Sequence, residues 1–165
     1  MNQVVKLAKK HKASVEAELG QIGGAEDGVS AEILYADPVQ CQKMAKQTKI
    51  TALAPALGSV HGLYKEEPKL AFDRMLDISM KTNLPLVLHG GTGIPKEQII
   101  KAIECGTCKI NVNTELQIAW RNGVINFINA NPSVYDPRKL IGGGENLMRA
   151  AIREKVTLFG SGSRV

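Results

Sequence analysis

Two histidines follow apolar runs in a pattern that suits metal binding or acid–base chemistry. His61 comes near the end of APALGSVHG and His89 near the end of LPLVLHGG, and each is followed directly by glycine. If both runs are strands of one parallel sheet, their carboxyl ends lie together at the mouth of a barrel, where metals and catalytic groups are found. A catalytic zinc site uses three protein ligands, so a third must come from elsewhere. His11 has neither feature, and we expect it on the surface.

Carboxylates precede these histidines in the segment VEAELGQIGGAEDG, residues 15–28. Alternation along a strand places Glu16 and Glu18 on one side of it. They face either a barrel interior or an outer layer of helices, and the spacing leaves both interpretations open. Glu26 and Asp27 follow among glycines in an expected loop, where the pattern alone favours a solvated turn.

Two turns are candidates for binding an anion. Gly90-Gly91-Thr92-Gly93 leads to a helix expected from Pro95, and Asn111-Val112-Asn113-Thr114 leads to the following helix. Backbone N–H groups in such turns, with a helix dipole behind them, attract anions, and the last two strands of a barrel often hold phosphate. Because these turns accompany the paired histidines, we interpret them as a phosphate site.

Two further features have simpler interpretations. Cys105-Gly-Thr-Cys108 has the spacing of a redox or zinc motif, but it has no second pair and joins a helix end to a strand start, which favours ordinary packing. Lys109 opens the expected fourth strand. A Schiff-base role is the less favoured interpretation of Lys109, since lysines at strand starts are usually solvated at the other end of a barrel.

The elements that position these residues alternate between strands and helices. Strands are expected at residues 14–19, 51–57, 84–89 and 109–112, and helices at residues 39–48, 69–80, 96–104, 115–130 and 145–154. Asn113 or Thr114 can cap the fourth helix, and a glycine-rich turn at residues 142–144 precedes the last. Four β/α units amount to half of a (β/α)₈ barrel. We therefore predict an α/β fold, a half TIM barrel forming one unit over residues 1–165 without an internal linker.

The opening of the chain and the ends of this sheet point to a partner. Residues 2–12 look like the second half of an amphipathic helix that runs straight into a strand. A half barrel leaves two open parallel edges, which can pair with another chain. We expect that the chain either associates or is a piece of a larger protein.

Composition excludes several classes of protein. Of 165 residues, 44% are hydrophobic and 22% charged, the mix of a soluble globular protein. The net charge is +5, but only 4% of residues are aromatic and the lysines are scattered, which argues against nucleic-acid binding. Three cysteines, an odd number, argue for a reducing compartment, by default the cytoplasm. Neither a signal peptide nor an apolar run of about 18 residues is present, so we expect neither export nor membrane insertion.

Several motifs together resemble the C-terminal half of the class II, metal-dependent fructose-bisphosphate aldolases. They are VEAELGQIGGAEDG, LAPALGSVHGLYKEEPKL, LPLVLHGGTGIP, KINVNTELQIA, VYDPRKL and LFGSGSR, in this order and with compatible spacing. The match is specific to the ketose-bisphosphate aldolases, and LAPALGSVHG and NVNTE look more like the fructose than the tagatose-bisphosphate branch. The resemblance implies the C-terminal half of a (β/α)₈ barrel. It also implies reversible cleavage of fructose 1,6-bisphosphate to dihydroxyacetone phosphate and glyceraldehyde 3-phosphate through a zinc-stabilised enediolate.

The resemblance also implies roles for individual residues. His61 and His89 match two zinc ligands, and Glu18 matches a carboxylate at a second or alternate metal position, divalent or monovalent. Glu26 matches an acidic loop residue implicated in proton exchange at the substrate carbon. Positions lining the dihydroxyacetone-phosphate site are matched by Gly62, Gly90, Gly91, Thr92, Asn111, Val112, Asn113 and Thr114, with Thr92 where many members have serine. Arg138 matches an arginine that reaches the far phosphate across the subunit interface of related dimers.

Two functional groups of the family have no counterpart in this chain. The family's earlier strands supply a third zinc-binding histidine and a neighbouring aspartate that donates a proton, and neither motif is present here. We therefore expect aldolase activity only in the presence of an N-terminal half. The expected partners are a sugar bisphosphate and either that half or a second copy in a homo-oligomer, without nucleic acid or membrane. The alternatives are a tagatose-bisphosphate aldolase, or a non-catalytic half barrel that self-associates.

Overall fold

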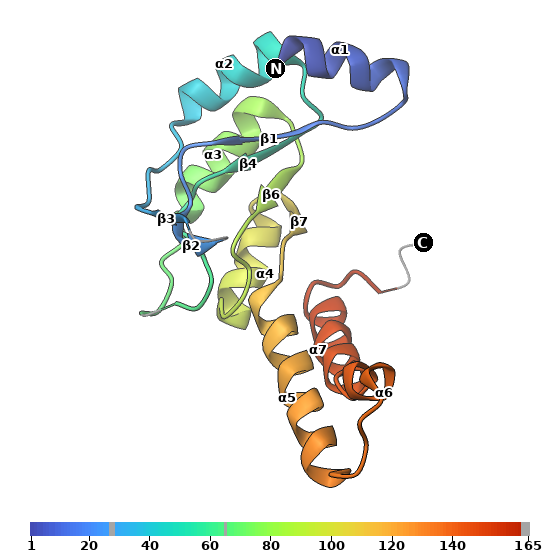
Figure 1. Ribbon diagram of the computed structural model, residues 1–165. Helices are drawn as coiled ribbons and strands as arrows, with labels where there is room; N and C mark the ends of the chain where they lie inside the picture. Colours follow the sequence, from blue (N-terminus) through green and yellow to red (C-terminus); the bar gives the residue numbers. More distant parts are fainter. Residues whose placement is uncertain (27–28, 65, 163–165) are drawn as a thin grey trace. The chain divides into compact units, whose positions relative to one another are not determined.

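The computed structural model describes residues 1–26, 29–64 and 66–162 (Figure 1). Contacts between residues divide the chain into two compact units, Met1–Asn111 and Val112–Val165, and each unit is described by itself. The expectation that residues 1–165 form one structural unit stays a prediction, because each unit is described separately. Among the residues described, no helix is long and apolar enough to cross a membrane.

The first unit is built on a four-stranded parallel sheet. Its strands, in their order across the sheet, are β1 (Glu16–Leu19), β4 (Ala52–Pro55), β6 (Leu86–Leu88) and β7 (Thr107–Ile110). The two central strands are almost wholly buried, which agrees with their nearly continuous apolar sequences. The four predicted strands are confirmed, and the fourth begins earlier than predicted. A register shift in its pairing with β6, where Leu86 pairs with Thr107 but Val87 with Lys109, adds residues at its start.

A small second sheet lies where the sequence predicted only a loop. Its strands, in sheet order, are β3 (Val29–Ala31), β2 (Gly23–Glu26) and β5 (Val60–His61). The antiparallel pair β2 and β3 escaped prediction because its glycines read as turn residues. Gly24 has φ +93°, and a Cβ atom there would lie 2.2 Å from the carbonyl oxygen of His61. Glycine is thus required for the close approach of β2 to the strand that carries His61.

Helices cover one face of the four-stranded sheet. They are α2 (Pro38–Thr48), α3 (Phe72–Thr82) and α4 (Lys96–Glu104), with α1 (Asn2–Lys10) next to α2, and Figure 1 shows α3 and α4 behind the strands. Asp37 caps α2 by accepting a hydrogen bond from the Gln40 N–H at 2.9 Å. The helix predicted at residues 69–80 is present as α3, but it begins only at Phe72, and the Ala71 N–H before it donates to the Leu57 carbonyl.

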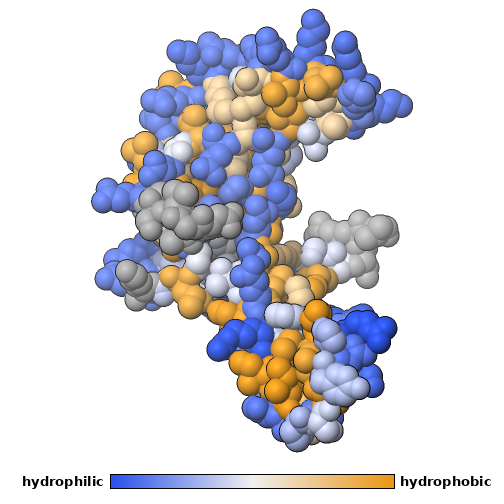
Figure 2. Space-filling model, viewed as in Figure 1, coloured by the Kyte–Doolittle hydropathy of each residue, from blue (hydrophilic) through white to orange (hydrophobic). Residues whose placement is uncertain are grey.

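The second unit is a helical hairpin with a short third helix. Its helices are α5 (Thr114–Ala130), α6 (Pro137–Gly142) and α7 (Glu145–Leu158), of which the sequence analysis missed α6. The turn before α7 lies tightly against α5, since a Cβ at Gly144 would be 2.3 Å from the Trp120 ring. Lys155 and Glu115 form a largely buried ion pair at 2.8 Å between α7 and α5. Apolar side chains including Ile125, Ile128 and Ile141 remain exposed, and Figure 2 shows apolar surface over this unit.

Candidate functional site

The two predicted histidines lie together at the carboxyl ends of their strands. His89 directly follows β6, and His61 is the last residue of β5. Their rings are stacked, with centroids 5.9 Å apart and an interplanar angle of 29°. His11, by contrast, lies on the surface after α1, as expected. The structure thus brings together two imidazoles from the carboxyl ends of β5 and β6, which belong to different sheets.

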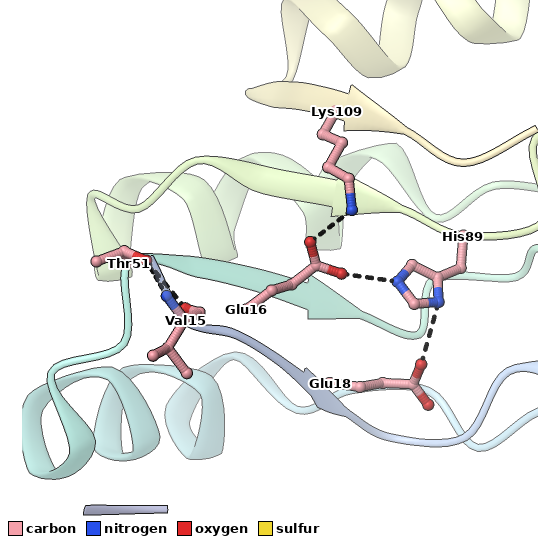
Figure 3. A network of polar contacts seen from close by, with 6 residues as sticks. All are labelled: Val15, Glu16, Glu18, Thr51, His89 and Lys109. Carbon is pink, nitrogen blue, oxygen red and sulfur yellow. Dashed lines mark hydrogen bonds and ion pairs between the residues drawn. The ribbon is translucent and has the colours of Figure 1, made fainter. Parts of the chain in front are cut away.

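Both glutamates of β1 point toward His89 (Figure 3). Glu16 Oε1 lies 3.1 Å from His89 Nε2, and Glu18 Oε2 lies 3.4 Å from His89 Nδ1. Of the two orientations that the sequence left open, the structure therefore has the one that faces the histidine and not the helix layer. The imidazole of His89 is held between two carboxylates, with 19% of its side chain exposed.

Lys109 completes this cluster from the far strand. Its Nζ atom lies 2.7 Å from Glu16 Oε2, so the side chain, which is 54% exposed as the prediction of a solvated lysine requires, also forms an ion pair that the sequence did not predict. Because β7 begins at Thr107, Lys109 is not the first residue of the strand and shares the sheet face of Glu16. Burial acts to raise the pKa of Glu16, but hydrogen bonds from Lys109 and His89 outweigh it, and the pKa is lowered.

Small side chains on β4 let the cluster form across the sheet. In the parallel register, Glu16 pairs with Ala52 and Glu18 with Ala54, so these residues share one face. β4 separates β1 from β6. Alanine at both positions leaves room above β4 for the glutamate side chains to reach His89 on the next strand.

A tyrosine joins the two loops that carry the histidines. The Tyr64 hydroxyl donates to the Gly90 carbonyl at 2.9 Å and accepts from the Val60 N–H at 3.1 Å. Burial raises the pKa of Tyr64, which keeps the phenol protonated and able to donate. The same loops meet closely at Gly90, where a Cβ would lie 2.1 Å from the Val60 carbonyl oxygen. Sequence reasoning missed Tyr64, although its position three residues after His61 was a usable signal.

The predicted substrate-binding residues divide between the two units. Those in the first unit gather near His89: Thr92 is 5% exposed, the Asn111 N–H donates to the Leu88 carbonyl, and the Gly91 N–H donates to the Asn111 carbonyl. Gly62, directly after His61, has φ +87°. Those in the second unit are Val112, Asn113, Thr114 and Arg138. The backbone of Glu26 is part of β2. The side chain of Glu26 and the whole of Asp27 lie outside what the structure describes.

Arg138 and the cysteine pair have clear local surroundings. Arg138, at the start of α6, pairs with Asp136 at 2.8 Å and keeps 90% of its side chain exposed. Hydrogen bonds from Arg138 lower the pKa of Asp136. Cys105 is buried and Cys108 is exposed, and both are free thiols, which agrees with ordinary packing.

The donor atoms around His89 suit a zinc ion, although the set is incomplete. Two imidazoles on one tetrahedral zinc, with Zn–N of about 2.0–2.1 Å, have ring centroids about 5 Å apart, close to the separation seen here. The Glu18 carboxylate adds an oxygen donor beside them. Within the described part of the chain, no three His, Cys, Asp or Glu side chains are already gathered as a metal-binding group. Closure of such a site requires a further ligand.

Comparison with known proteins identifies the family. A family model described as fructose-bisphosphate aldolase class-II matches residues 1–164. The chain belongs to this family. A class II aldolase is generally metal-dependent, which agrees with the donor set around His89, and the resemblance predicted from the sequence is confirmed.

Two fructose-bisphosphate aldolases are similar over nearly all of this chain. The fructose-bisphosphate aldolase of Geobacillus stearothermophilus is 54% identical over 164 residues, covering 99% of this chain and 57% of the relative. The fructose-bisphosphate aldolase of Staphylococcus aureus (strain Mu50) is 53% identical over 163 residues, covering 98% of this chain and 57% of the relative. The chain thus spans little more than half the length of these aldolases.

Solved structures confirm the predicted half barrel. The crystal structure of the YdjI aldolase from Escherichia coli K12 superimposes with a TM-score of 0.79 at 31% identity, over 99% of this chain and 55% of that one. The four-stranded parallel sheet with its helices is therefore the C-terminal half of a class II aldolase TIM barrel.

Proposed function

We propose that the chain is the C-terminal half of a zinc-dependent aldolase that cleaves fructose 1,6-bisphosphate reversibly to dihydroxyacetone phosphate and glyceraldehyde 3-phosphate. The observation that carries this proposal is that His89 lies against both His61 and Glu18 in a chain of the class II family. Family membership alone supports the reaction class. These two contacts of His89 support the metal-dependent chemistry.

His61 and His89 would hold the metal, and Glu18 would hold it in a second or alternate position. When bound, zinc supplies a Lewis acid that polarises the substrate carbonyl. The loop contacts made by Tyr64 fix the backbone on both sides of the histidines, so the two imidazoles keep their separation. Neutral imidazole is the form of histidine that binds zinc.

Substrate binding is assigned to the turns that follow the strands. Glycines 62, 90 and 91 let the backbone approach a phosphate closely, and Thr92 adds a hydroxyl beside them. Asn111, Val112, Asn113 and Thr114 would extend this phosphate site, and Arg138 would bind the far phosphate through charge-assisted hydrogen bonds. Glu26 would exchange a proton at the substrate carbon. The family resemblance supports these assignments.

Turnover needs groups that this chain does not carry. A third histidine ligand and the proton-donating aspartate belong to earlier strands of the family, so the 165-residue chain alone is expected to bind zinc weakly and to lack aldolase activity. Addition of the N-terminal half of the Geobacillus stearothermophilus relative should restore cleavage in a coupled assay. Cleavage by the chain before that addition would contradict the proposal, and tagatose 1,6-bisphosphate as the better substrate would favour the other branch.

The outer strands of the four-stranded sheet favour association of this chain with another chain. β1 and β7 are the terminal strands of the four-stranded sheet, and each pairs with one neighbour in it. Unpaired parallel edges are templates for another strand. Either an N-terminal half or a second copy would cover them. Sizing chromatography of the purified chain should show dimers or larger species that dissociate when the N-terminal half is added, whereas a stable monomer would exclude self-association.

All three cysteines of the chain are free thiols in the structure. Free thiols persist in a reducing compartment, which supports the cytoplasm as the proposed location.

A further inference from the structure

We propose that Glu16, itself held by Lys109, is a positioning residue that fixes the His89 ring with Nε2–H toward Glu16 and the Nδ1 lone pair toward Glu18. The inference rests on the proposed metal site in one respect, because it assigns Nδ1 as the nitrogen that would bind the ion. The orientation of the His89 ring by Glu16 does not depend on that site, because it is a property of the chain without metal.

The two sides of the His89 ring differ. Nε2 makes a hydrogen bond with Glu16 Oε1 at 3.1 Å, whereas Nδ1 lies 3.4 Å from Glu18 Oε2, beyond the usual range for a charge-assisted bond. Ionised carboxylates only accept hydrogen bonds, and Nε2 makes the shorter of the two contacts, so we place the proton of the neutral ring on Nε2. The lone pair on Nδ1 then faces a carboxylate oxygen. Two electron-rich atoms that face one another favour a cation between them.

Lys109 distinguishes the two carboxylates. It binds the second oxygen of Glu16 at 2.7 Å, so Glu16 is held at both oxygens and its charge is offset. The ion pair recorded for Glu18 is with His89 itself. Glu16 is therefore suited to orient the ring, while the charge of Glu18 remains for a cation.

This arrangement has a known physical effect on metal ligands. A carboxylate that accepts the distal N–H of a ligating histidine fixes its tautomer and makes the other nitrogen more basic, and its loss typically weakens metal binding about 10- to 100-fold. Glu16 would act through His89 and would not contact substrate.

The first test follows the ring proton in the metal-free 165-residue chain. Nitrogen-15 spectra at about pH 8, above the ordinary histidine pKa of about 6.5, report which ring nitrogen of His89 is protonated. The chain has 3 histidines, so substituting His11 and His61 in turn assigns the signals. We expect a proton on Nε2 that exchanges slowly with water. Glu16→Ala should make it exchange rapidly, whereas Glu104→Gln, at an exposed carboxylate at the end of α4, should not.

The second test measures zinc affinity by titration of the same chain. Glu16→Gln and Lys109→Met should raise the zinc Kd about 10-fold or more, Lys109→Arg should restore it, and Glu104→Gln should leave it unchanged. Circular dichroism verifies that each variant is folded.

The outcomes separate this inference from the proposed function. A His89 proton on Nδ1, or a protected proton in Glu16→Ala, would overturn the positioning role. Equal zinc affinity of Glu16→Gln and Glu104→Gln would do the same. If the wild-type chain binds no zinc at all, the proposed metal site is in question, and the ring proton still decides the role of Glu16.

Discussion

Removing the Tyr64 hydroxyl tests whether this side chain holds the two histidine loops together. Tyr64→Phe keeps the aromatic ring and deletes one oxygen, which donates to the Gly90 carbonyl and accepts from the Val60 N–H. A hydrogen bond contributes about 0.5–1.5 kcal/mol net, so two give a loss of roughly 1–3 kcal/mol in the free energy of unfolding. The half-buried setting of the side chain leaves both backbone groups poorly placed to find water instead.

Urea unfolding followed by circular dichroism measures this loss. For a destabilisation of about 2 kcal/mol and a slope of about 2 kcal/mol/M, the midpoint falls by about 1 M. Tyr135→Phe is the matched control, because it deletes the same atom from a side chain that is 91% exposed, and its midpoint should not move. If the two variants unfold at the same urea concentration, the Tyr64 hydroxyl does not hold the loops and the reasoning is refuted.

Other predictions concern mechanism, substrate and thiols. In a reconstituted enzyme, a chelator should abolish activity and zinc restore it, and borohydride should trap no substrate on Lys109, whereas such trapping would indicate a lysine imine. Arg138→Ala should lower kcat/KM for the bisphosphate roughly 10- to 100-fold, as expected for a charged hydrogen bond, without changing the urea midpoint, because the side chain is 90% exposed; an equal loss of stability would make it a packing residue. With a thiol reagent near neutral pH, Cys108 should react first. Cys41 should resist until the chain unfolds, because burial raises its pKa to about 11 and only the thiolate reacts; rapid labelling of Cys41 would contradict its burial.

The parallel strands and most helix starts could be predicted because each has a local signal. Continuous apolar runs mark β4 and β6, and Asp37 before proline marks the start of α2. The hairpin of β2 and β3 could not be predicted in this way. Its glycines are selected by the close approach of Gly24 to His61, which is a contact between distant residues and leaves only a turn-like composition in the sequence.

In the candidate site, too, features with a local sequence signal could be predicted and features that depend on contacts between distant residues could not. The pairing of His61 with His89 could be predicted, because each has its own strand–histidine–glycine pattern. The position of Lys109 could not, because a register shift in the pairing of β6 with β7 makes it an interior residue of the strand. The sequence of one strand does not predict a register shift, because the shift depends on how two strands pair.

The orientation of Glu16 and Glu18 depends on residues that are not on their own strand. Alternation places both on one face but is silent on which face that is. The residues of the neighbouring strand β4 determine the face. Ala52 and Ala54 lie on the same face of the sheet as Glu16 and Glu18, and Leu53, which is fully buried, lies on the opposite face. Large apolar side chains fill the space under the helices, so a carboxylate there would be buried without water. The alanine face is the one with room for two carboxylates to reach across to His89. The sizes of side chains on the neighbouring strand therefore determine where the charges of β1 lie, and through them the orientation of the histidine ring.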